Sequence, residues 1–401
     1  MEALRTPRPL PAVELAEPLV SVVIPCLNEA ASVGECVRDA RRALDDSGLS
    51  GEVLVVDNGS SDGSAAIATE AGARVVRELR RGYGSAYATG FGEARGRFIV
   101  MADADMSYDL ADIPRFVEEL QAGADIVMGS RLKGRIHDGA MPWLHRRVGN
   151  PFLTGVLNLF FGTRISDAHC GMRALRRDLL PRLDLQATGM ELASEQLIRS
   201  SKLGLEIREI PIAYLPRIGR SKLSPLPDGW RHLRLLLVHS PTWLFIVPGA
   251  ALLVLAAIAG ALGLTGTAGL NDELPTLLVA SMLAIVGSQL VQFGVFARSY
   301  AVWHLGERDL LFDGIRRRIS LETVLTAGAA VALAGTAATT VMVIRWWNQG
   351  IDAPLERSLT VASLTLAVIG VQIVFGAFLL SVLGLRQRRS EAGPPGPHAT
   401  L

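Results

Sequence analysis

Four long apolar runs in the C-terminal part of the chain constrain its fold more than any other feature. They lie near residues 241–265, 275–297, 321–344 and 358–385, and each is almost free of charged side chains. A helix needs about 20 apolar residues to cross a bilayer. The alternative, a set of buried core helices, is disfavoured because the runs lack the polar faces that a soluble bundle presents to water. We therefore predict an all-α membrane domain of four transmembrane helices over residues 241–385.

The distribution of basic residues predicts the orientation of these spans. The segment after the second run holds five arginines and the tail after the fourth holds three, whereas the segments after the first and third hold none and two. Because cytoplasmic loops carry the excess of Lys and Arg, both termini are expected in the cytoplasm, with residues 386–401 as a basic tail. Residues 1–18 contain four prolines and no continuous apolar stretch, which predicts a flexible segment and not a signal peptide. The expected location is the cell's inner, or plasma, membrane.

The remaining composition excludes several functions. Lys and Arg number 40 against 39 Asp and Glu, so neither disorder nor nucleic-acid binding through bulk charge is expected. Cys26, Cys36 and Cys170 are too few and too scattered for a disulfide framework or a zinc site, and we expect buried, reduced thiols.

Residues 19–224 have a different pattern, in which short β-branched runs alternate with amphipathic stretches. Examples are "LVSVVIP", "EVLVVDN" and "ARVVRE", separated by "ASVGECVRDARRAL" and "SDGSAAIATEAG". This alternation is typical of an α/β domain with a mostly parallel, Rossmann-like sheet covered on both faces. Further strands are expected at "RFIVMADA", "ADIVMGSR" and "EIREIPIAYL". Ligands of such domains bind at the carboxyl ends of the strands.

Three of these strand ends are polar. The first strand runs into "PCLNE", the second into "DNGSSDG", and the fourth into Asp103-Ala104-Asp105. Asp103 and Asp105 can both reach one Mg²⁺ or Mn²⁺ ion, which would relieve the repulsion between carboxylates and also take diphosphate oxygens. Each feature alone has another interpretation, because Asp-x-Asp is common and "DNGSSDG" can simply be a turn that caps a helix. The glycines of "RRGYGSAYATGFGEARG" suit either an ordinary loop or close approach of the backbone to a ligand.

Taken together and in order, these motifs resemble a family 2 glycosyltransferase with the GT-A fold. Within that family the chain looks like the polyprenyl-phosphate branch, which includes dolichol-phosphate mannose and glucose synthases. The resemblance covers about residues 19–245 and rests on "VVIPCLNE", "VVDNGSSDGS", "VMADAD", "VMGSRL", "DAHCGMRALRRD" and "PRIGRSKL". The apolar half is similar to the family only in having spans after a catalytic domain.

The resemblance implies roles for the matching residues at the donor site. The residues implied for the nucleotide pocket are Pro25, Leu27, Glu29, Asp57 and Asp103. Asp103 and Asp105 would hold the Mg²⁺ or Mn²⁺ ion. Some relatives supply a further ligand from a Gln at the position where this chain has Ser107, so the third metal ligand is left open.

The resemblance also implies cations for the phosphates and a residue for catalysis. Arg131, Arg217 and Lys222 would bind donor or acceptor phosphate, and the alternative for the last two is contact with anionic lipid head groups. Asp167 is the implied catalytic residue together with Arg131. It would orient the acceptor, bind a sugar hydroxyl or act as a base, although a lipid phosphate with a second pKa of about 6 needs no strong base.

Three other segments bear on the substrates. Residues 225–240 predict an interfacial amphipathic helix with Trp230 on its apolar side. The stretch "PFLTGVLNLFFG" is either a second lipid-contacting helix or a core helix. Glu191 and Glu195 lie four residues apart on one helical face, where they either face the sugar or have a capping or solvated role. The Gln-x-x-Arg-Trp motif of processive synthases is incomplete, because Ser200 follows Arg199.

These observations predict an inverting, metal-dependent transferase. It would move a glucose- or mannose-type sugar from a UDP- or GDP-linked donor to polyprenyl or dolichyl phosphate at the cytoplasmic face. The expected partners are the nucleotide sugar, the lipid phosphate and membrane lipid, but not nucleic acid, and a homo-oligomer is left open. The alternatives are a processive or protein-directed family 2 transferase, and a membrane scaffold or lipid translocase with a degenerate transferase domain.

Overall fold

The chain forms two compact units. A computed structural model describes residues 17–219, 225–265, 274–304, 320–349 and 354–391. Contacts divide the chain into Met1–Leu236 and Leu237–Leu401. The division falls inside helix α8 (Pro225–Val238), which covers most of the segment predicted as an interfacial helix. The placement of that helix at a membrane surface stays a prediction, as do the domain limits at residues 18, 224, 240 and 385.

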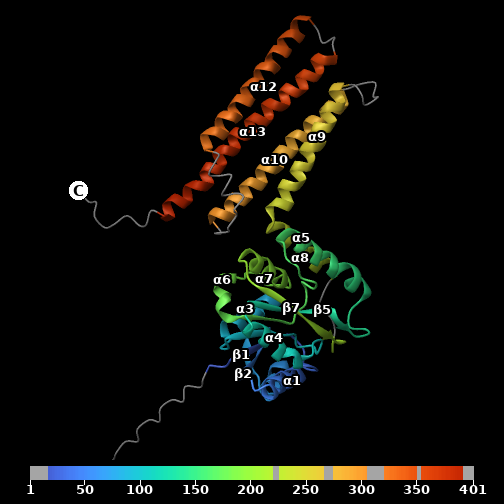
Figure 1. The fold of residues 1–401 in the computed structure, drawn as a ribbon, viewed down its shortest axis with the longest axis vertical. Coiled ribbons are helices and arrows are strands. Elements are labelled where there is room, and N and C mark those ends of the chain that lie inside the picture. Colours follow the sequence, from blue (N-terminus) through green and yellow to red (C-terminus); the bar gives the residue numbers. More distant parts are fainter. Residues whose placement is uncertain (1–16, 220–224, 266–273, 305–319, 350–353, 392–401) are drawn as a thin grey trace, which may run out of the picture. The chain divides into compact units, whose positions relative to one another are not determined.

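The first unit is built on a seven-stranded sheet. Its strands are β1 (Val20–Cys26), β2 (Gly51–Asp57), β3 (Arg74–Arg77), β4 (Phe98–Met101), β5 (Ile126–Ile136), β6 (Arg173–Arg176) and β7 (Ile207–Tyr214). They lie in the order β3-β2-β1-β4-β6-β5-β7. Figure 1 labels β1, β2, β5 and β7 of this sheet. The pairs within β3-β2-β1-β4 are parallel, and so is β5-β7, whereas β6 is antiparallel to both of its neighbours. The predicted α/β domain with a mostly parallel sheet is therefore confirmed.

Strand β6 is the one strand in the described residues that the sequence pattern does not predict. The other six coincide with the predicted β-branched runs. β6 has the sequence "RALR", so its charged ends hide the apolar alternation that marks a strand. Arg173 at its start is nevertheless only 1% exposed, because its guanidinium donates hydrogen bonds to carbonyl oxygens inside the domain.

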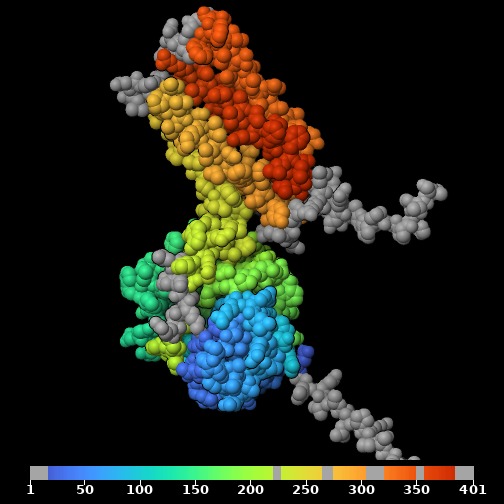
Figure 2. All heavy atoms as spheres, turned by 180° about the vertical axis from the view of Figure 1, so that it is seen from behind, coloured from blue at the N-terminus to red at the C-terminus, as the bar shows by residue number. Residues whose placement is uncertain are grey.

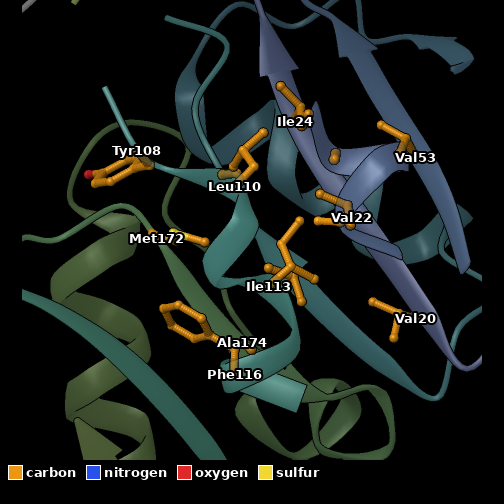
Figure 3. Close-up of a cluster of buried hydrophobic side chains, with 14 of the residues drawn as sticks. Val20, Val22, Ile24, Val53, Tyr108, Leu110, Ile113, Phe116, Met172 and Ala174 are labelled. Atoms are coloured by element: carbon orange, nitrogen blue, oxygen red, sulfur yellow. The ribbon is translucent and has the colours of Figure 1, made fainter. Parts of the chain in front are cut away.

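Helices cover both faces of the sheet. The first face carries α1 (Val33–Asp46) and α4 (Ile113–Gln121), and Figure 3 shows Ile113 of α4 beside Val22 of β1, with Phe116 of α4 beside Ala174 of β6. The second face carries α3 (Tyr83–Glu93), α5 (Asn150–Phe161) and α7 (Leu192–Lys202), and it buries Val23 and Leu54. Because successive strand residues point to opposite faces, neighbours such as Val22 and Val23 belong to different cores. The shorter helices are α2 (Ser64–Glu70) and α6 (Leu180–Leu183).

The second unit contains the predicted membrane spans. In its described residues the long helices are α9 (Val247–Thr265), α10 (Leu274–His304), α12 (Leu321–Gln349) and α13 (Pro354–Glu391). Each is long and apolar enough to cross a bilayer. Helix α10 packs against α9 and α13, and α12 packs against α13. Hydrogen bonds of 2.6 Å between Ser281 and Thr365 and 2.9 Å between Ser288 and Gln372 join α10 to α13. No more than 17% of the most apolar window of each span is buried inside the structure, and Figure 2 shows these helices as the yellow-to-red spheres. The chain is an integral membrane protein.

Candidate active site

The loops that follow β1 and β2 are tied to each other by hydrogen bonds. Asn28 adopts the left-handed φ of 52°, and its Oδ1 accepts from the N–H of Ser61 at 2.8 Å. Its own N–H donates to Ser60 Oγ at 2.9 Å. The N–H of Glu29 donates to Ser64 Oγ at 2.9 Å. The "DNGSSDG" segment is therefore a turn, as one interpretation predicts, and the turn also fixes the position of Glu29.

Asp57 and Asn58 organise the next part of this edge. Asp57 is buried and its Oδ1 accepts from the N–H of Ser60 at 3.0 Å. The amide of Asn58 donates to the carbonyl oxygen of Arg80 at 2.8 Å and accepts from the N–H of Gly82 at 2.7 Å. Asn58 thus holds the start of the glycine-rich segment, a role that the sequence analysis missed. The position of Asn58, directly after Asp57 at the end of a strand, could have indicated this role in the sequence.

The two aspartates after β4 lie in a buried setting. Asp103 Oδ1 accepts a hydrogen bond of 3.1 Å from the hydroxyl of Tyr83, and Asp105 is only 5% exposed. Burial, together with the neighbouring carboxylate of Asp105, raises the pKa of Asp103 to about 7. A bound cation would favour the ionised form of Asp103.

The surroundings of these carboxylates fit a magnesium or manganese ion that is shared with a diphosphate. A Cβ added to Gly171 would lie 2.7 Å from Asp103 Oδ2, so only glycine leaves this space open. In the described part of the chain no group of three or more His, Cys, Asp or Glu side chains gathers around one point. Mg²⁺ commonly uses one or two carboxylates, several waters and substrate phosphates, so two aspartates suffice. Ser107, at the position of the open third ligand, is buried and donates its N–H to Asp105 Oδ1 at 3.0 Å.

Arg131 and Asp167 form a buried, bidentate ion pair. Arg131 Nε and Nη2 donate to the two oxygens of Asp167 at 2.7 and 2.8 Å, and its backbone N–H donates at 3.1 Å. Burial by itself would raise the pKa of Asp167, but the guanidinium of Arg131 more than offsets this and lowers it. The guanidinium also lies 5.1 Å from the centre of the Tyr214 ring. Both carboxylate oxygens are thus bound by a cation, which favours positioning over proton abstraction.

Arg173 fixes the loop that carries Asp167. Its guanidinium donates to the carbonyl oxygens of Cys170, Ala168 and Ala193, each at 2.7 Å. These bonds join the loop to α7. The sequence analysis quoted Arg173 only as part of a motif and assigned it no role, because a buried arginine cannot be told from an exposed one by its spacing.

A segment after β7, residues 215–219, crosses this edge, and we call it the strap. The N–H of Leu215 donates to the carbonyl oxygen of Ser107 and the N–H of Ile218 to that of Asp105, both at 2.9 Å. The side chain of Arg217 forms an ion pair with Asp105. Gly219 has a φ of 95°, and a Cβ there would lie 3.5 Å from Glu29 Oε2.

The structure brings most of the predicted site residues to one edge of the sheet. The ion pair of Arg217 with Asp105 joins the strap to the loop after β4. Tyr83 of α3 donates to Asp103 in the same loop. The charge of Arg131 also acts on Asp103. Pro25 lies at the end of β1, where it pairs with Val56, and Leu27 follows directly. Lys222 lies outside the described residues. The roles assigned to all of these residues remain predictions.

Two glutamates of uncertain role have different environments. Glu195 is buried and accepts from the N–H groups of Gln186 at 3.0 Å and Ala187 at 2.7 Å, so it fixes the loop before α7 and is not solvated. Glu191 Oε1 accepts from the N–H of Gly189 at 3.2 Å, while its Oε2 is buried without a hydrogen-bond partner in the described part of the chain.

Helix α5 and the residues before it expose an apolar face. The exposed large side chains on this segment are Trp143, Leu144, Val148, Phe152 and Leu159. Leu157 on the same helix is fully buried in the core of the second face. The core interpretation of "PFLTGVLNLFFG" is therefore confirmed for the side that carries Leu157. Contact of the exposed side with lipid stays a prediction. Trp230 of α8 is likewise 60% exposed.

Comparison with known proteins identifies the family. Residues 21–183 match the glycosyl transferase family 2 model, and residues 295–384 match the model of the glycosyltransferase family 2 C-terminal transmembrane region. The low-salt glycan biosynthesis hexosyltransferase of Haloferax volcanii is 41% identical over 371 residues, which cover 92% of this chain and 89% of the relative. A dolichyl-phosphate hexose transferase of the same organism is 34% identical over 212 residues, covering 52% of this chain and 89% of the relative.

Among solved structures, the chain is similar to glucosyl-3-phosphoglycerate synthase from Mycobacterium tuberculosis in complex with Mn²⁺, UDP and glucosyl-3-phosphoglycerate. The identity is 25%, the TM-score is 0.45, and the match covers 56% of this chain and 79% of that chain. The sequence matches are the stronger finding. They define the protein as a hexosyltransferase with an α/β catalytic domain and four apolar helices. It belongs to glycosyltransferase family 2.

Proposed function

We propose that the protein transfers a glucose- or mannose-type sugar from a UDP- or GDP-linked donor to polyprenyl or dolichyl phosphate, with inversion. The observation that carries this proposal is the meeting of Asp103, Asp105 and Arg217 at one sheet edge in a chain that also has four apolar spans. The relative named as a dolichyl-phosphate hexose transferase supports a lipid phosphate as the acceptor.

The donor would be held by residues of the β1, β2 and β4 ends. Asp103 and Asp105 would bind Mg²⁺ or Mn²⁺, which supplies Lewis-acid stabilisation of the leaving diphosphate. Arg217 would bind diphosphate oxygens, for which its planar guanidinium is suited. Glu29, whose backbone N–H donates to Ser64 Oγ, would contact the nucleoside together with Asp57.

The acceptor phosphate would meet the positive charge of Arg131. Asp167 and Tyr214 fix that guanidinium, so Asp167 acts as a positioning residue. An oxygen of the lipid phosphate attacks the anomeric carbon on the side opposite the diphosphate, and the bond from that carbon to the diphosphate breaks. Since the lipid phosphate has a second pKa of about 6, it is already largely ionised at neutral pH and needs no strong base.

The apolar surfaces support an active site close to the membrane. Trp143, Phe152 and Trp230 are exposed on the catalytic unit, and amphipathic surfaces of this kind lie at the boundary between head groups and acyl chains. The excess of arginine after the second and fourth spans supports the cytoplasmic face. The phosphate of a polyprenyl lipid lies at that depth.

The proposal is tested with the purified full chain in detergent, a short polyprenyl phosphate, Mn²⁺ or Mg²⁺, and a panel of labelled UDP- and GDP-hexoses. We expect a glycolipid that mild acid cleaves, and a loss of transfer of at least about a hundredfold in Asp105→Asn. Arg115→Ala is the control, because Arg115 lies on the surface of α4 and forms its ion pair with Asp112, away from the sheet edge that carries Asp103 and Asp105. Full activity without divalent metal, or no lipid product from any donor, would contradict the proposal.

A further inference from the structure

The strap places a cation of the protein on a carboxylate that is predicted to bind the metal. Arg217 pairs with Asp105 Oδ2, and the N–H of Ile218 donates to the carbonyl oxygen of the same residue at 2.9 Å. Asp105 is 5% exposed, so this contact closes the carboxylate off from solvent. Arg217 also has a buried Nε without a hydrogen-bond partner among the described residues.

A guanidinium and a divalent cation compete for this site. Both are attracted by the same carboxylate oxygen, and two cations at contact distance in a buried setting repel each other strongly. Without a cation at this point, the buried carboxylate of Asp105 would lack its ion-pair partner beside the partly buried carboxylate of Asp103. Arg217 therefore supplies in the free protein the positive charge that the metal supplies in the complex.

We propose that Arg217 is an exchangeable counter-ion: it holds Asp105 while the donor is absent and moves to the diphosphate when metal and nucleotide sugar bind. This inference rests on the proposed function, since it takes a metal–diphosphate as the ligand. Gly219 provides the backbone freedom for the movement, because its φ of 95° is one that residues with a side chain rarely adopt. The exchange also brings the strap residues into contact with the bound donor.

The proposal predicts how metal and nucleotide binding are coupled. Metal alone must displace Arg217 from Asp105, and the guanidinium then lacks a partner. Metal with a nucleoside diphosphate offers Arg217 new oxygens, so the nucleotide strengthens metal binding. Removing the charge of Arg217 should therefore strengthen the binding of metal alone. It should also reduce the gain in metal affinity that the nucleotide provides.

The test measures Mn²⁺ binding to the full chain in detergent by the electron paramagnetic resonance of free Mn²⁺. Mn²⁺ is titrated alone, with UDP and with GDP, against the wild type and the variants Arg217→Gln and Gly219→Ala. We expect Arg217→Gln to bind Mn²⁺ alone more tightly by about tenfold, and the gain from nucleotide to shrink. Gly219→Ala strains the strap while keeping Arg217, so it should shift binding of Mn²⁺ alone in the same direction. Arg115→Ala is the control and should bind like the wild type.

The outcomes separate this inference from the proposed function. If the wild type binds Mn²⁺ and Asp105→Asn does not, but Arg217→Gln leaves binding of Mn²⁺ alone unchanged or weaker, the exchange is refuted and the metal site stands. If the wild type binds no Mn²⁺ with either nucleotide, both the metal-dependent function and the exchange are refuted.

Discussion

The buried pair of Arg131 and Asp167 gives the sharpest prediction about stability. Asp167→Asn keeps the shape of the side chain but removes the charge that compensates the guanidinium. Asp167 is 0% exposed and Arg131 is 7% exposed, and the pair shares hydrogen bonds of 2.7 and 2.8 Å. Removing one partner of such a pair costs about 3–5 kcal/mol, because a buried charge is left alone.

This cost can be measured as a shift in thermal unfolding. For a unit of this size, 3–5 kcal/mol corresponds to a decrease in Tm of roughly 6 to 20 °C. The double variant Arg131→Met with Asp167→Leu removes both charges and should lose less than either single variant. Because Arg131 lowers the pKa of Asp167 despite its burial, the pair stabilises the fold above the unfolded-state pKa of about 3.9. That stabilisation is lost as pH falls through the lower folded-state pKa.

The assay is differential scanning fluorimetry of the full chain in detergent at neutral pH, with Arg115→Ala as the surface control. A decrease for Asp167→Asn below about 2 °C would refute the reasoning, because surface changes alone produce effects of this size. So would a double variant whose loss equals the sum of the two single losses, since that sum would mean that the residues do not interact.

Three further predictions concern the metal edge and helix α5. Burial and the neighbouring Asp105 raise the pKa of Asp103 to about 7. Mn²⁺ affinity should therefore be about tenfold lower at pH 6 than at pH 8, where the carboxylate is ionised. Equal affinities at the two pH values in calorimetric titrations would disprove this. Gly171→Ala should weaken Mn²⁺ binding because its Cβ would lie 2.7 Å from Asp103 Oδ2, whereas Gly155→Ala, with no neighbour within 4 Å, should bind as the wild type does. Leu157 is fully buried and Phe152 is 58% exposed. Leu157→Ala should therefore lower the free energy of unfolding by about 2–5 kcal/mol, and Phe152→Ser by no more than about 0.5 kcal/mol. Similar losses for the two variants in thermal unfolding would contradict the assignment of one buried and one exposed side to α5.

The fold could largely be predicted because its signals are local. β-branched runs mark six strands, and apolar length marks the four spans, independently of anything elsewhere in the chain. Strand β6 has no such local signal, because its ends are Arg173 and Arg176. Its strand conformation comes from pairing with β4 and β5. Tertiary context overrides local pattern at such a position.

The site could be predicted only where a local rule applies. Carboxylates at strand ends predict a metal site, and the sequence alone places Asp103 and Asp105 directly after β4; their role as ligands stays a prediction. The pairing of Arg217 with Asp105 joins residues 112 positions apart, and that of Arg131 with Asp167 joins residues 36 apart. No periodicity connects such positions, and the burial of Arg173 depends on carbonyl groups that come together only in the folded loop.

The central claim is that the acceptor is a lipid phosphate, and the choice of acceptor tests it most directly. The full chain is given Mn²⁺, its preferred labelled nucleotide sugar and either a short polyprenyl phosphate or the same polyprenol without phosphate. The account predicts transfer to the phosphate and none to the alcohol, because Arg131 recognises the charge and the phosphate oxygen is the nucleophile. Equal transfer to both lipids, or transfer to neither lipid while a peptide or sugar chain is glycosylated, would contradict it.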